Sequence, residues 1–212
     1  MNNQQSLSFF KTLAVTAKNP DKAIKLGSGD LTEYDTIFIM RYLDKETDWL
    51  DIGTGSGLIV NKIYDKCASV TAIEPLSEYS QYITKAKNIN IVSQNILFYS
   101  SNKTYDLITC FGVMHYFNEL EAKKVYGNLY CILKNTGRII IKNQFALKED
   151  VTIEHYSKEL DKNYFANYRS IKKECQLLAN VGFRNFEIID IYPPKKNRWS
   201  NTHFYAITAQ KG

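Results

Sequence analysis

The sequence lacks three features that would assign it to a class of protein at once: a long apolar segment, paired cysteines and a cluster of histidines. No apolar run approaches the roughly 20 residues needed to cross a bilayer. The four cysteines include no C-x-x-C pair and lie mostly in apolar patterns, which favours buried free thiols in a reducing cytosol over a disulfide or zinc framework. With only three histidines and no paired aspartates suited to magnesium, we expect no metal site.

A strong excess of one charge is also missing. The 27 Lys and Arg residues against 22 Asp and Glu residues give a net charge of +5, and the one tight basic cluster is Lys195, Lys196 and Arg198. An enzyme that acts on nucleic acid usually carries a denser basic stripe, so we expect a small-molecule partner. The first residues, MNNQQSLSFFKTLAV, lack the pattern of a signal peptide. We therefore expect a cytoplasmic protein without a membrane span, either a monomer or a homodimer.

The order of short apolar runs predicts an α/β fold. From residue 48 onward, strands are expected at 49–52, 69–73, 89–92, 105–110 and 138–141, with helices over 58–66, 77–87 and 119–133. Because a parallel return requires a crossover helix, this alternation predicts a Rossmann-like, doubly wound, mostly parallel sheet. Two further strands, at 186–192 and 203–208, are joined by only about ten residues. This last pair is expected to be antiparallel and to complete a seven-stranded sheet.

No internal repeat or low-complexity block divides the chain, which we interpret as one domain. Apolar residues at helical spacing in 6–18 and 31–44 predict two N-terminal helices. Residues 144–169 are aromatic and charged without clean periodicity, and an irregular insertion beyond a strand end suits a substrate lid. We expect four parts, a helical cap, a cofactor-binding core, the lid, and a C-terminal helix with the strand pair, at 1–45, 46–143, 144–169 and 170–212.

A glycine-rich turn, DIGTGSG at 51–57, follows the first strand and precedes a helix. Glycine tolerates positive φ and leaves no Cβ between the backbone and a ligand. The helix start offers free N–H groups to an anionic or carboxylate-bearing ligand, and Asp51 can accept hydrogen bonds from a ligand ammonium group. The turn by itself indicates a nucleotide-like ligand.

A second carboxylate stands at the end of the second strand, where Glu74 precedes Pro75. A carboxylate in this position can accept hydrogen bonds from both hydroxyls of a ribose. Glu74 follows Gly57 by about one helix and one strand, so the fold is expected to bring it beside the glycine turn.

Three runs, WLDIGTGSG, VTAIEP and TYDLITCFGVMHYF, together resemble the class I family of S-adenosylmethionine-dependent methyltransferases in their order and spacing. The likeness covers about residues 30–210 and includes the NTGRIIIKNQF strand and the terminal strand pair. It implies S-adenosylmethionine as the cofactor, S-adenosylhomocysteine as the product, and no metal.

The resemblance also implies which residues bind the cofactor. They are Tyr34, Asp51, Gly53, Thr54, Gly55, Gly57, Glu74, Pro75, Asn95, Ile96, Phe111 and Gly112. Asp51 would face the methionine end and Glu74 the ribose, while Asn95 and Ile96 would flank the adenine. Many relatives carry Asp where Asn95 stands, although an amide can still donate and accept. Tyr34 fits the cofactor carboxylate and a packing role equally well.

Methyl transfer needs a base when the acceptor is a hydroxyl or a protonated amine. His115 follows Phe111 and Gly112, which the resemblance places at the sulfonium. Histidine titrates near neutral pH and is the natural candidate for a catalytic base. A packing or capping role is the alternative for this residue.

The candidate substrate-binding residues lie in the lid segment and the last strand. They are Tyr156, Tyr164, Tyr168, Arg169 and His203. The tyrosines can equally pack the lid onto the sheet. Arg169 resembles a position that faces the acceptor in related enzymes, which implies a carboxylate or phosphate on the substrate. On this hypothesis Arg169→Ala raises KM for the acceptor and leaves cofactor affinity intact.

These patterns predict methyl transfer to an O or N atom of a small sugar, nucleotide-linked or secondary metabolite, anionic if Arg169 faces it. Methylation of RNA or protein is the first alternative, weakened for nucleobases because no NPPY-like run follows the fourth strand. A nicotinamide enzyme fits less well, since G-x-G-x-G after an Asp differs from G-x-G-x-x-G. A cofactor-binding scaffold without transferase activity is the non-enzymatic alternative.

Overall fold

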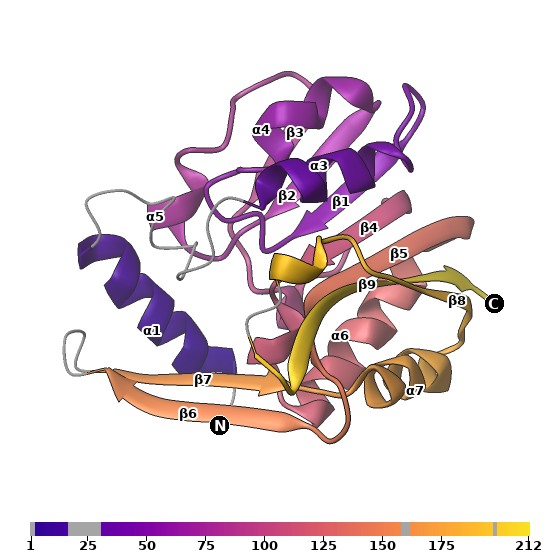
Figure 1. Cartoon of the computed structure of the whole chain (residues 1–212). Coiled ribbons are helices and arrows are strands. Elements are labelled where there is room, and N and C mark those ends of the chain that lie inside the picture. The colour runs from indigo at the N-terminus through magenta and orange to yellow at the C-terminus, as the bar shows by residue number, and fades with distance from the viewer. Residues whose placement is uncertain (1–2, 17–30, 158–161, 197–198) are drawn as a thin grey trace.

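The computed structural model describes residues 3–16, 31–157, 162–196 and 199–212, and a seven-stranded sheet forms its centre (Figure 1). The strands are β1 (Asp48–Ile52), β2 (Ser69–Ile73), β3 (Ile89–Val92), β4 (Tyr105–Phe111), β5 (Leu133–Ala146), β8 (Phe183–Ile189) and β9 (Thr202–Lys211). Their order is β3-β2-β1-β4-β5-β9-β8. β9 runs antiparallel to β5 and β8, and the other pairings are parallel. The predicted Rossmann-like sheet with an antiparallel C-terminal strand is confirmed.

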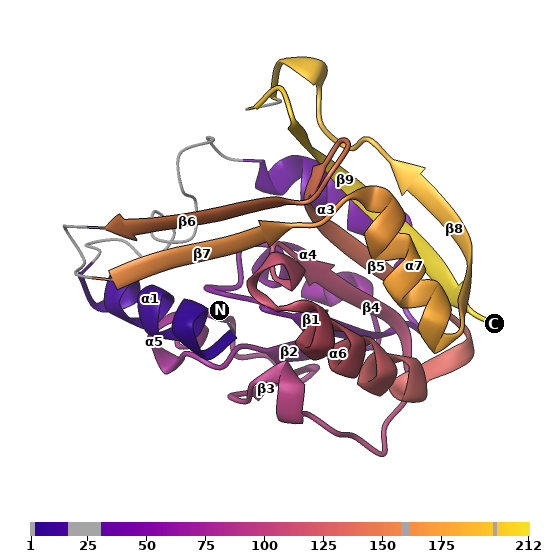
Figure 2. The ribbon, with the colours of Figure 1, turned by 90° about the horizontal axis from the view of Figure 1, so that it is seen from below.

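Helices cover both faces of this sheet (Figures 1 and 2). The six described α-helices are α1 (Asn3–Thr16), α3 (Thr32–Met40), α4 (Val60–Ile63), α5 (Ser77–Ser80), α6 (Glu119–Ile132) and α7 (Ile171–Val181). One buried cluster joins α6 and α7 to alternate strand residues such as Leu50 and Ile141. The second joins α3 and α4 to the opposite face, where Trp49 and Ile140 point. The alternation of side chains along each strand therefore builds two separate cores.

Two of the expected helices are much shorter than the sequence indicated. The helix predicted over 58–66 is α4 followed by a 3₁₀ turn, and the one predicted over 77–87 is only α5. The Asn61 side chain donates to the carbonyl of Tyr82 at 3.0 Å and accepts from the N–H of Thr84 at 2.7 Å. These bonds satisfy backbone groups that a continuous helix would have paired internally, so the segment after α5 folds as turns.

The lid segment is regular, which corrects the expectation of an irregular insertion. β5 extends to Ala146, and β6 (Val151–Ser157) pairs with β7 (Lys162–Tyr168) in a separate antiparallel hairpin. β7 packs against both α1 and the 3₁₀ turn Met114–Tyr116. Because β7 contacts both of these elements, its residues lack the simple alternation of polar and apolar side chains that a half-exposed strand shows.

The hairpin and α1 lie at one end of the sheet, beyond the carboxyl ends of β1 and β4 (Figures 1 and 2). The predicted strand at 186–192 begins earlier, at Phe183, and ends at Ile189. Arg198 of the basic cluster lies outside the described residues. Among the helices that the structure describes, none combines the length and apolar character needed to cross a membrane.

Candidate active site

The glycine turn adopts the backbone conformation that its composition predicts. Gly53, Gly55 and Gly57 have φ of +69°, +59° and +83°, a region that residues with a Cβ rarely adopt. The N–H groups of Gly53 and Thr54 donate to the carbonyl of Ile73 at 2.8 and 3.1 Å, which fixes the turn against the end of β2. A Cβ on Gly53 would lie 2.3 Å from Cγ2 of Val113. Glycine is therefore required at this position by both conformation and space.

Glu74 lies directly beside this turn. Its carboxylate accepts hydrogen bonds from the N–H of Gly55 at 3.0 Å and the N–H of Leu76 at 2.9 Å. The side chain is buried, and burial raises its pKa to about 7. Two backbone bonds leave lone pairs on both oxygens, so the carboxylate can still accept from two ligand hydroxyl groups.

Asp51 lies in β1 at the start of the turn. Its Oδ1 accepts from the Thr109 hydroxyl at 2.6 Å, and that hydroxyl accepts from Nε1 of Trp49 at 2.7 Å. Burial raises the pKa of Asp51 to about 6. A cationic ligand group beside the carboxylate would favour its ionised form and offset this burial.

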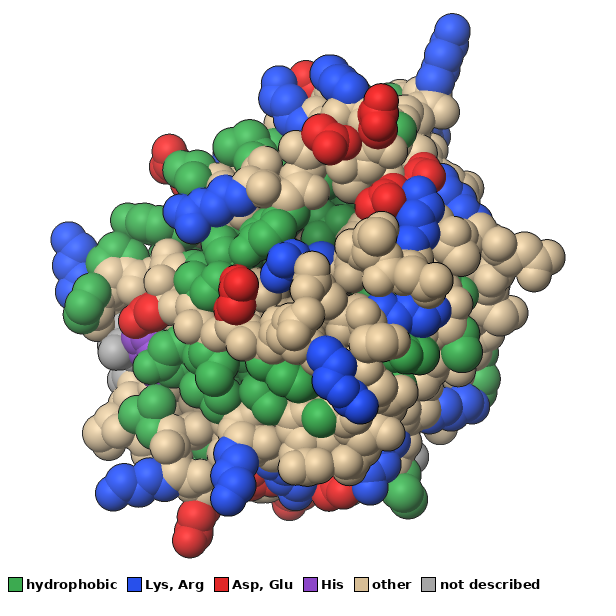
Figure 3. Space-filling model, turned by 90° about the vertical axis from the view of Figure 1, so that its right-hand side faces the viewer, with side chains coloured by type: hydrophobic (Ala, Val, Ile, Leu, Met, Phe, Trp, Pro, Cys, Tyr) green, Lys and Arg blue, Asp and Glu red, His purple; other side chains and the backbone are tan. Residues whose placement is uncertain are grey.

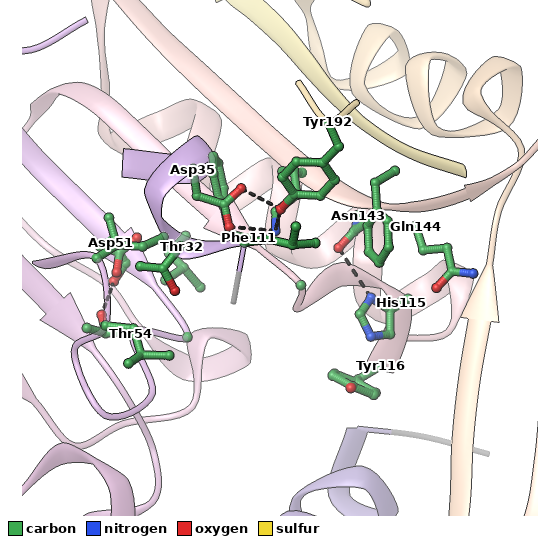
Figure 4. Close-up of a pocket in the computed structure, with 18 of the residues that line it drawn as sticks. Thr32, Asp35, Asp51, Thr54, Phe111, His115, Tyr116, Asn143, Gln144 and Tyr192 are labelled. Atoms are coloured by element: carbon green, nitrogen blue, oxygen red, sulfur yellow. Dashed lines mark hydrogen bonds and ion pairs between the residues drawn. The ribbon is translucent and has the colours of Figure 1, made fainter. Parts of the chain in front are cut away.

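Two cavities meet at the glycine turn. The first, of about 160 Å³, is lined by Glu74, Pro75, Asn95 and Ile96. The second, of about 250 Å³, is lined by Asp51 and Thr54 and extends toward the hairpin (Figure 4). The residues common to both are Ile52, Gly53, Phe111, Gly112 and Tyr116. The two spaces are therefore neighbouring parts of one site.

Helix α1 covers the first cavity, a role that could not be assigned from the sequence. Asn3, Ser6, Leu7 and Phe10 line this cavity. The N–H of Asn3 lies 3.2 Å from both oxygens of the Glu121 carboxylate, and its Oδ1 accepts from Nδ2 of Asn95 at 2.7 Å. Apolar residues at helical spacing indicate only that a helix packs, not what it packs over.

Asn95 was predicted to flank an adenine, and its side chain has protein partners on both polar atoms. Nδ2 donates to Asn3, and Oδ1 accepts from the N–H of Leu97 at 3.0 Å. The amide therefore fastens α1 to the loop after β3 and lines the cavity at the same time.

His115 lines the second cavity, as its position in the sequence predicted. Nδ1 lies 3.2 Å from Oδ1 of Asn143, and the ring contacts those of Tyr116 and Tyr168 at centroid distances of 4.0 and 5.5 Å. Burial lowers the pKa of His115 to about 3. The imidazole is therefore neutral near pH 7 and holds a second proton poorly.

A charged cluster that the sequence analysis missed lies on the wall of the same cavity (Figure 4). Nζ of Lys142 in β5 lies 3.0 Å from Oδ2 of Asp35 in α3 and donates to the Tyr192 hydroxyl at 2.9 Å. That hydroxyl donates to Oδ1 of Asp35 at 2.6 Å. The signal available in the sequence was a lysine inside the apolar strand IIIKNQF, since a lysine is rarely buried without a partner.

Arg169 was predicted to face the acceptor, and the structure corrects this. Its side chain is buried outside both cavities and forms an ion pair with Glu174. Nη1 donates to the carbonyl of Phe117 at 2.9 Å, and Nη2 donates to that of Met114 at 2.8 Å. With these partners, Arg169 joins the end of the hairpin to α7 and the loop after β4, and no described cavity opens onto its guanidinium.

Four other candidates also lie outside the two cavities, and one of them is Gly57, the last glycine of the turn. His203 is buried with Nε2 2.9 Å from Oδ2 of Asp190. Tyr156 is half exposed on β6. Tyr34 is partly exposed and packs edge-on against Tyr192 at a centroid distance of 6.0 Å, while its neighbour Asp35 lines the cavity in its place. Helical rotation explains this difference, because adjacent helix residues point about 100° apart.

Tyr164 and Tyr168 do line the second cavity, so the hairpin contributes part of its wall. Tyr164 packs against Phe9 of α1 at a centroid distance of 5.2 Å. The helix over one cavity therefore supports a ring in the wall of the other. No group of three or more His, Cys, Asp or Glu side chains suited to a metal is found among the described residues.

Comparison with known proteins assigns the family. A family model for a methyltransferase domain matches residues 32–188. A ubiquinone biosynthesis O-methyltransferase of Rickettsia akari (strain Hartford) is 27% identical over 184 residues, which cover 80% of this chain and 71% of that protein.

Solved structures share the fold at low identity. The DhpI–SAH complex has a TM-score of 0.76 at 12% identity, covering 99% of this chain and 97% of that one. A 1,6-didemethyltoxoflavin-N1-methyltransferase of Burkholderia thailandensis has a TM-score of 0.72 at 14% identity, covering 100% and 91%. The chain therefore belongs to the methyltransferase domain family and, as its glycine turn and Glu74 predict, is a class I S-adenosylmethionine-dependent methyltransferase.

Proposed function

We propose that this enzyme methylates an O or N atom of a small, planar acceptor bound between the glycine turn and the β6–β7 hairpin. The observation that carries the proposal is the second cavity, which adjoins the first at Phe111 and Gly112 and is walled by aromatic rings and side-chain amides. Aromatic walls favour a flat ligand through stacking and edge contacts. A volume of about 250 Å³ suits a metabolite rather than a polymer.

The residues around the glycine turn fit the cofactor. In the first cavity, Glu74 would accept from the ribose hydroxyls, and Ile96 and the α1 side chains would enclose the adenine. In the adjoining part of the second cavity, Asp51 would hold the ammonium of the methionine end. When bound, S-adenosylmethionine supplies an activated methyl group on a sulfonium. The chain's own task is then to hold the acceptor in line with that methyl, and positioning of this kind can supply much of the rate acceleration.

The R. akari relative is an O-methyltransferase and the B. thailandensis neighbour an N-methyltransferase. These names support methyl transfer to an O or N atom of a metabolite as the activity of this chain. On the face drawn in Figure 3, Lys and Arg side chains are interspersed with Asp and Glu side chains and form no continuous basic stripe. This favours a metabolite over RNA.

The decisive experiment follows a labelled methyl group. The purified protein is incubated with methyl-labelled S-adenosylmethionine and a cell extract separated into small-molecule, RNA and protein fractions. We expect label in the small-molecule fraction only. Label in RNA or protein instead would replace the proposed acceptor class, and calorimetric binding of S-adenosylhomocysteine without any transfer would leave a cofactor-binding scaffold.

The affinity for S-adenosylhomocysteine is expected to rise with pH between 6 and 8, by up to about tenfold per unit below the pKa. The carboxyl of Glu74 titrates near pH 7 in the free protein because it is buried, and only its ionised form accepts from both ribose hydroxyls. Calorimetry across this range measures the slope. Glu74→Gln should bind more weakly and lose most of the slope, whereas Glu46→Gln, in the exposed turn before β1, should behave as the wild type; equal slopes in all three would contradict the assignment.

His115 is expected to act as a neutral hydrogen-bonding residue. With its pKa near 3, the imidazole stays unprotonated as the pH falls from 8 to 5. The dependence of kcat/KM for the acceptor on pH, at saturating cofactor, should therefore have the same shape in the wild type and in His115→Gln. The measurement is a pair of pH profiles, wild type and variant, on the labelled product. A break near pH 6.5 present only in the wild type would restore His115 as a titrating base.

A further inference from the structure

The cluster of Lys142, Asp35 and Tyr192 contains the cation of the second cavity, and Asp51 at the glycine turn is a further carboxylate in its wall. Of the described residues that line the two cavities, Lys142 is the only one with a Lys or Arg side chain. Its side chain is only 11% exposed and that of Asp35 only 10%. A cation held this far from solvent interacts much more strongly with a ligand than one on the surface.

The ammonium is held in a fixed position. Asp35 and Tyr192 take two of its N–H groups, and an ammonium has three donors. The rings of Phe111, Tyr192 and Phe204 surround the nitrogen, with centroids 5.1, 5.4 and 5.9 Å away. Among the described partners no further hydrogen bond of Nζ is found, so one donor remains for a molecule in the cavity.

The groups that face Lys142 determine what that donor can bind. Asp35 compensates its charge, and His115, whose imidazole is neutral, adds none. Asn143 and Gln144 add neutral amides to the same wall. A carboxylate or phosphate presents two or three charged oxygens, which need more donors than this wall has free. The single oxygen of a phenolate or enolate, whose charge is partly delocalised into a flat ring, matches one free donor among aromatic side chains.

We propose that Lys142 determines acceptor specificity by binding an ionised phenol-type or enol-type oxygen of the acceptor. The enzyme then takes aromatic or heteroaromatic hydroxy compounds as oxyanions, and Asp35 and Tyr192 position the ammonium for this contact. The sequence suggested an acceptor with a carboxylate or phosphate bound by Arg169. The proposal keeps an anionic acceptor, but its charged group is a phenol-type or enol-type oxygen and the residue that binds it is Lys142. This inference rests on the proposed function, since it names the acceptor class of the same site.

The test uses 4-nitrophenol, whose ionisation changes its absorbance, and its methyl ether 4-nitroanisole, which has the same ring without an ionisable oxygen. Both are titrated into the wild-type protein saturated with S-adenosylhomocysteine. We expect nitrophenolate to bind at least about tenfold more tightly than nitroanisole, because one hydrogen bond between charged groups changes an affinity by at least about this factor. The pKa of the bound nitrophenol should fall below its value in water.

The variant pair is Lys142→Met combined with Asp35→Asn, which removes both charges together and leaves Tyr192 an amide oxygen to donate to. Nitrophenolate affinity should fall by about tenfold to a hundredfold, while nitroanisole affinity stays within about twofold. Lys172→Met, on the exposed side of α7, is the matched control and should change neither. Retained binding of S-adenosylhomocysteine reports that each variant is folded.

Equal affinity of the wild type for nitrophenolate and nitroanisole, or no binding of either, would overturn the proposal without any variant. So would a folded double variant that still prefers nitrophenolate. These results differ from failure of the proposed function, in which the wild type would not bind S-adenosylhomocysteine or would transfer no methyl group to a small molecule.

Discussion

Replacement of Arg169 by methionine is expected to destabilise the fold by about 3–5 kcal/mol, the usual penalty for removing one partner of a buried ion pair. The guanidinium donates to Glu174 and to the carbonyls of Met114 and Phe117. Without it, the Glu174 carboxylate stays buried, with the Tyr126 hydroxyl as its remaining described hydrogen-bond donor. The loss should appear as a lower midpoint of urea unfolding with an unchanged slope.

Two further variants isolate the cause. Arg169→Met combined with Glu174→Gln removes both charges and keeps an oxygen for Tyr126, so it should recover part of the lost stability. Lys172→Met, an exposed substitution one helical turn away, should stay within about 0.5 kcal/mol of the wild type. If Arg169→Met is as stable as the wild type and only raises KM for the acceptor, the structural role assigned to Arg169 is wrong.

The second large effect is expected at the glycine turn, where Gly53→Ala should lower stability by about 2–4 kcal/mol and weaken cofactor binding. A left-handed backbone costs a residue with a Cβ about 1–2 kcal/mol. The new Cβ would in addition lie 2.3 Å from Cγ2 of Val113, which must move. Unfolding in urea and calorimetry with S-adenosylhomocysteine measure the two effects.

Gly112 provides a matched comparison. Its φ of +71° is similar, yet nothing lies within 4 Å of a Cβ built on it. Gly112→Ala should therefore lose only the stability that the left-handed backbone costs, which is less than the loss in Gly53→Ala. Adding Val113→Ala to Gly53→Ala removes the clash and should reduce the loss to that of Gly112→Ala. Equal losses for Gly53→Ala and Gly112→Ala would show that the contact with Val113 is unimportant.

Elements whose signal is local in the sequence lie where they were predicted, and elements that depend on distant contacts do not. β2 and β3 match their predicted bounds because four or five apolar residues between turns form a strand wherever they lie in a parallel sheet. The length of α5 was overestimated because the Asn61 side chain, which belongs to α4, hydrogen-bonds the backbone of Tyr82 and Thr84 and ends helical pairing there. The hairpin was missed because β7 contacts α1 and the loop after β4, which hides its alternation.

The residues of the candidate site also differ in whether neighbouring elements or distant contacts place them. The glycine turn and Glu74 lie beside each other because the end of β2 pairs with the end of β1, an arrangement that any β-α-β unit imposes. The positions of the Arg169 and Lys142 side chains could not be predicted from neighbouring elements. An arginine near a lid can equally face a ligand or a buried carboxylate, and only the position of Glu174 on the next helix decides between them.

The sequence by itself therefore determined the family, the mostly parallel sheet with its antiparallel C-terminal strand, and the cofactor turn, because each depends on contacts within one or two neighbouring units. The acceptor cavity was decided only by the tertiary structure. Lys142 meets an Asp35 that lies 107 positions away, and Asp35 meets a Tyr192 that lies 157 positions away. Contacts of this range leave no periodicity or spacing in the sequence, since they form only when the strands, α3 and the last connection pack around the same space.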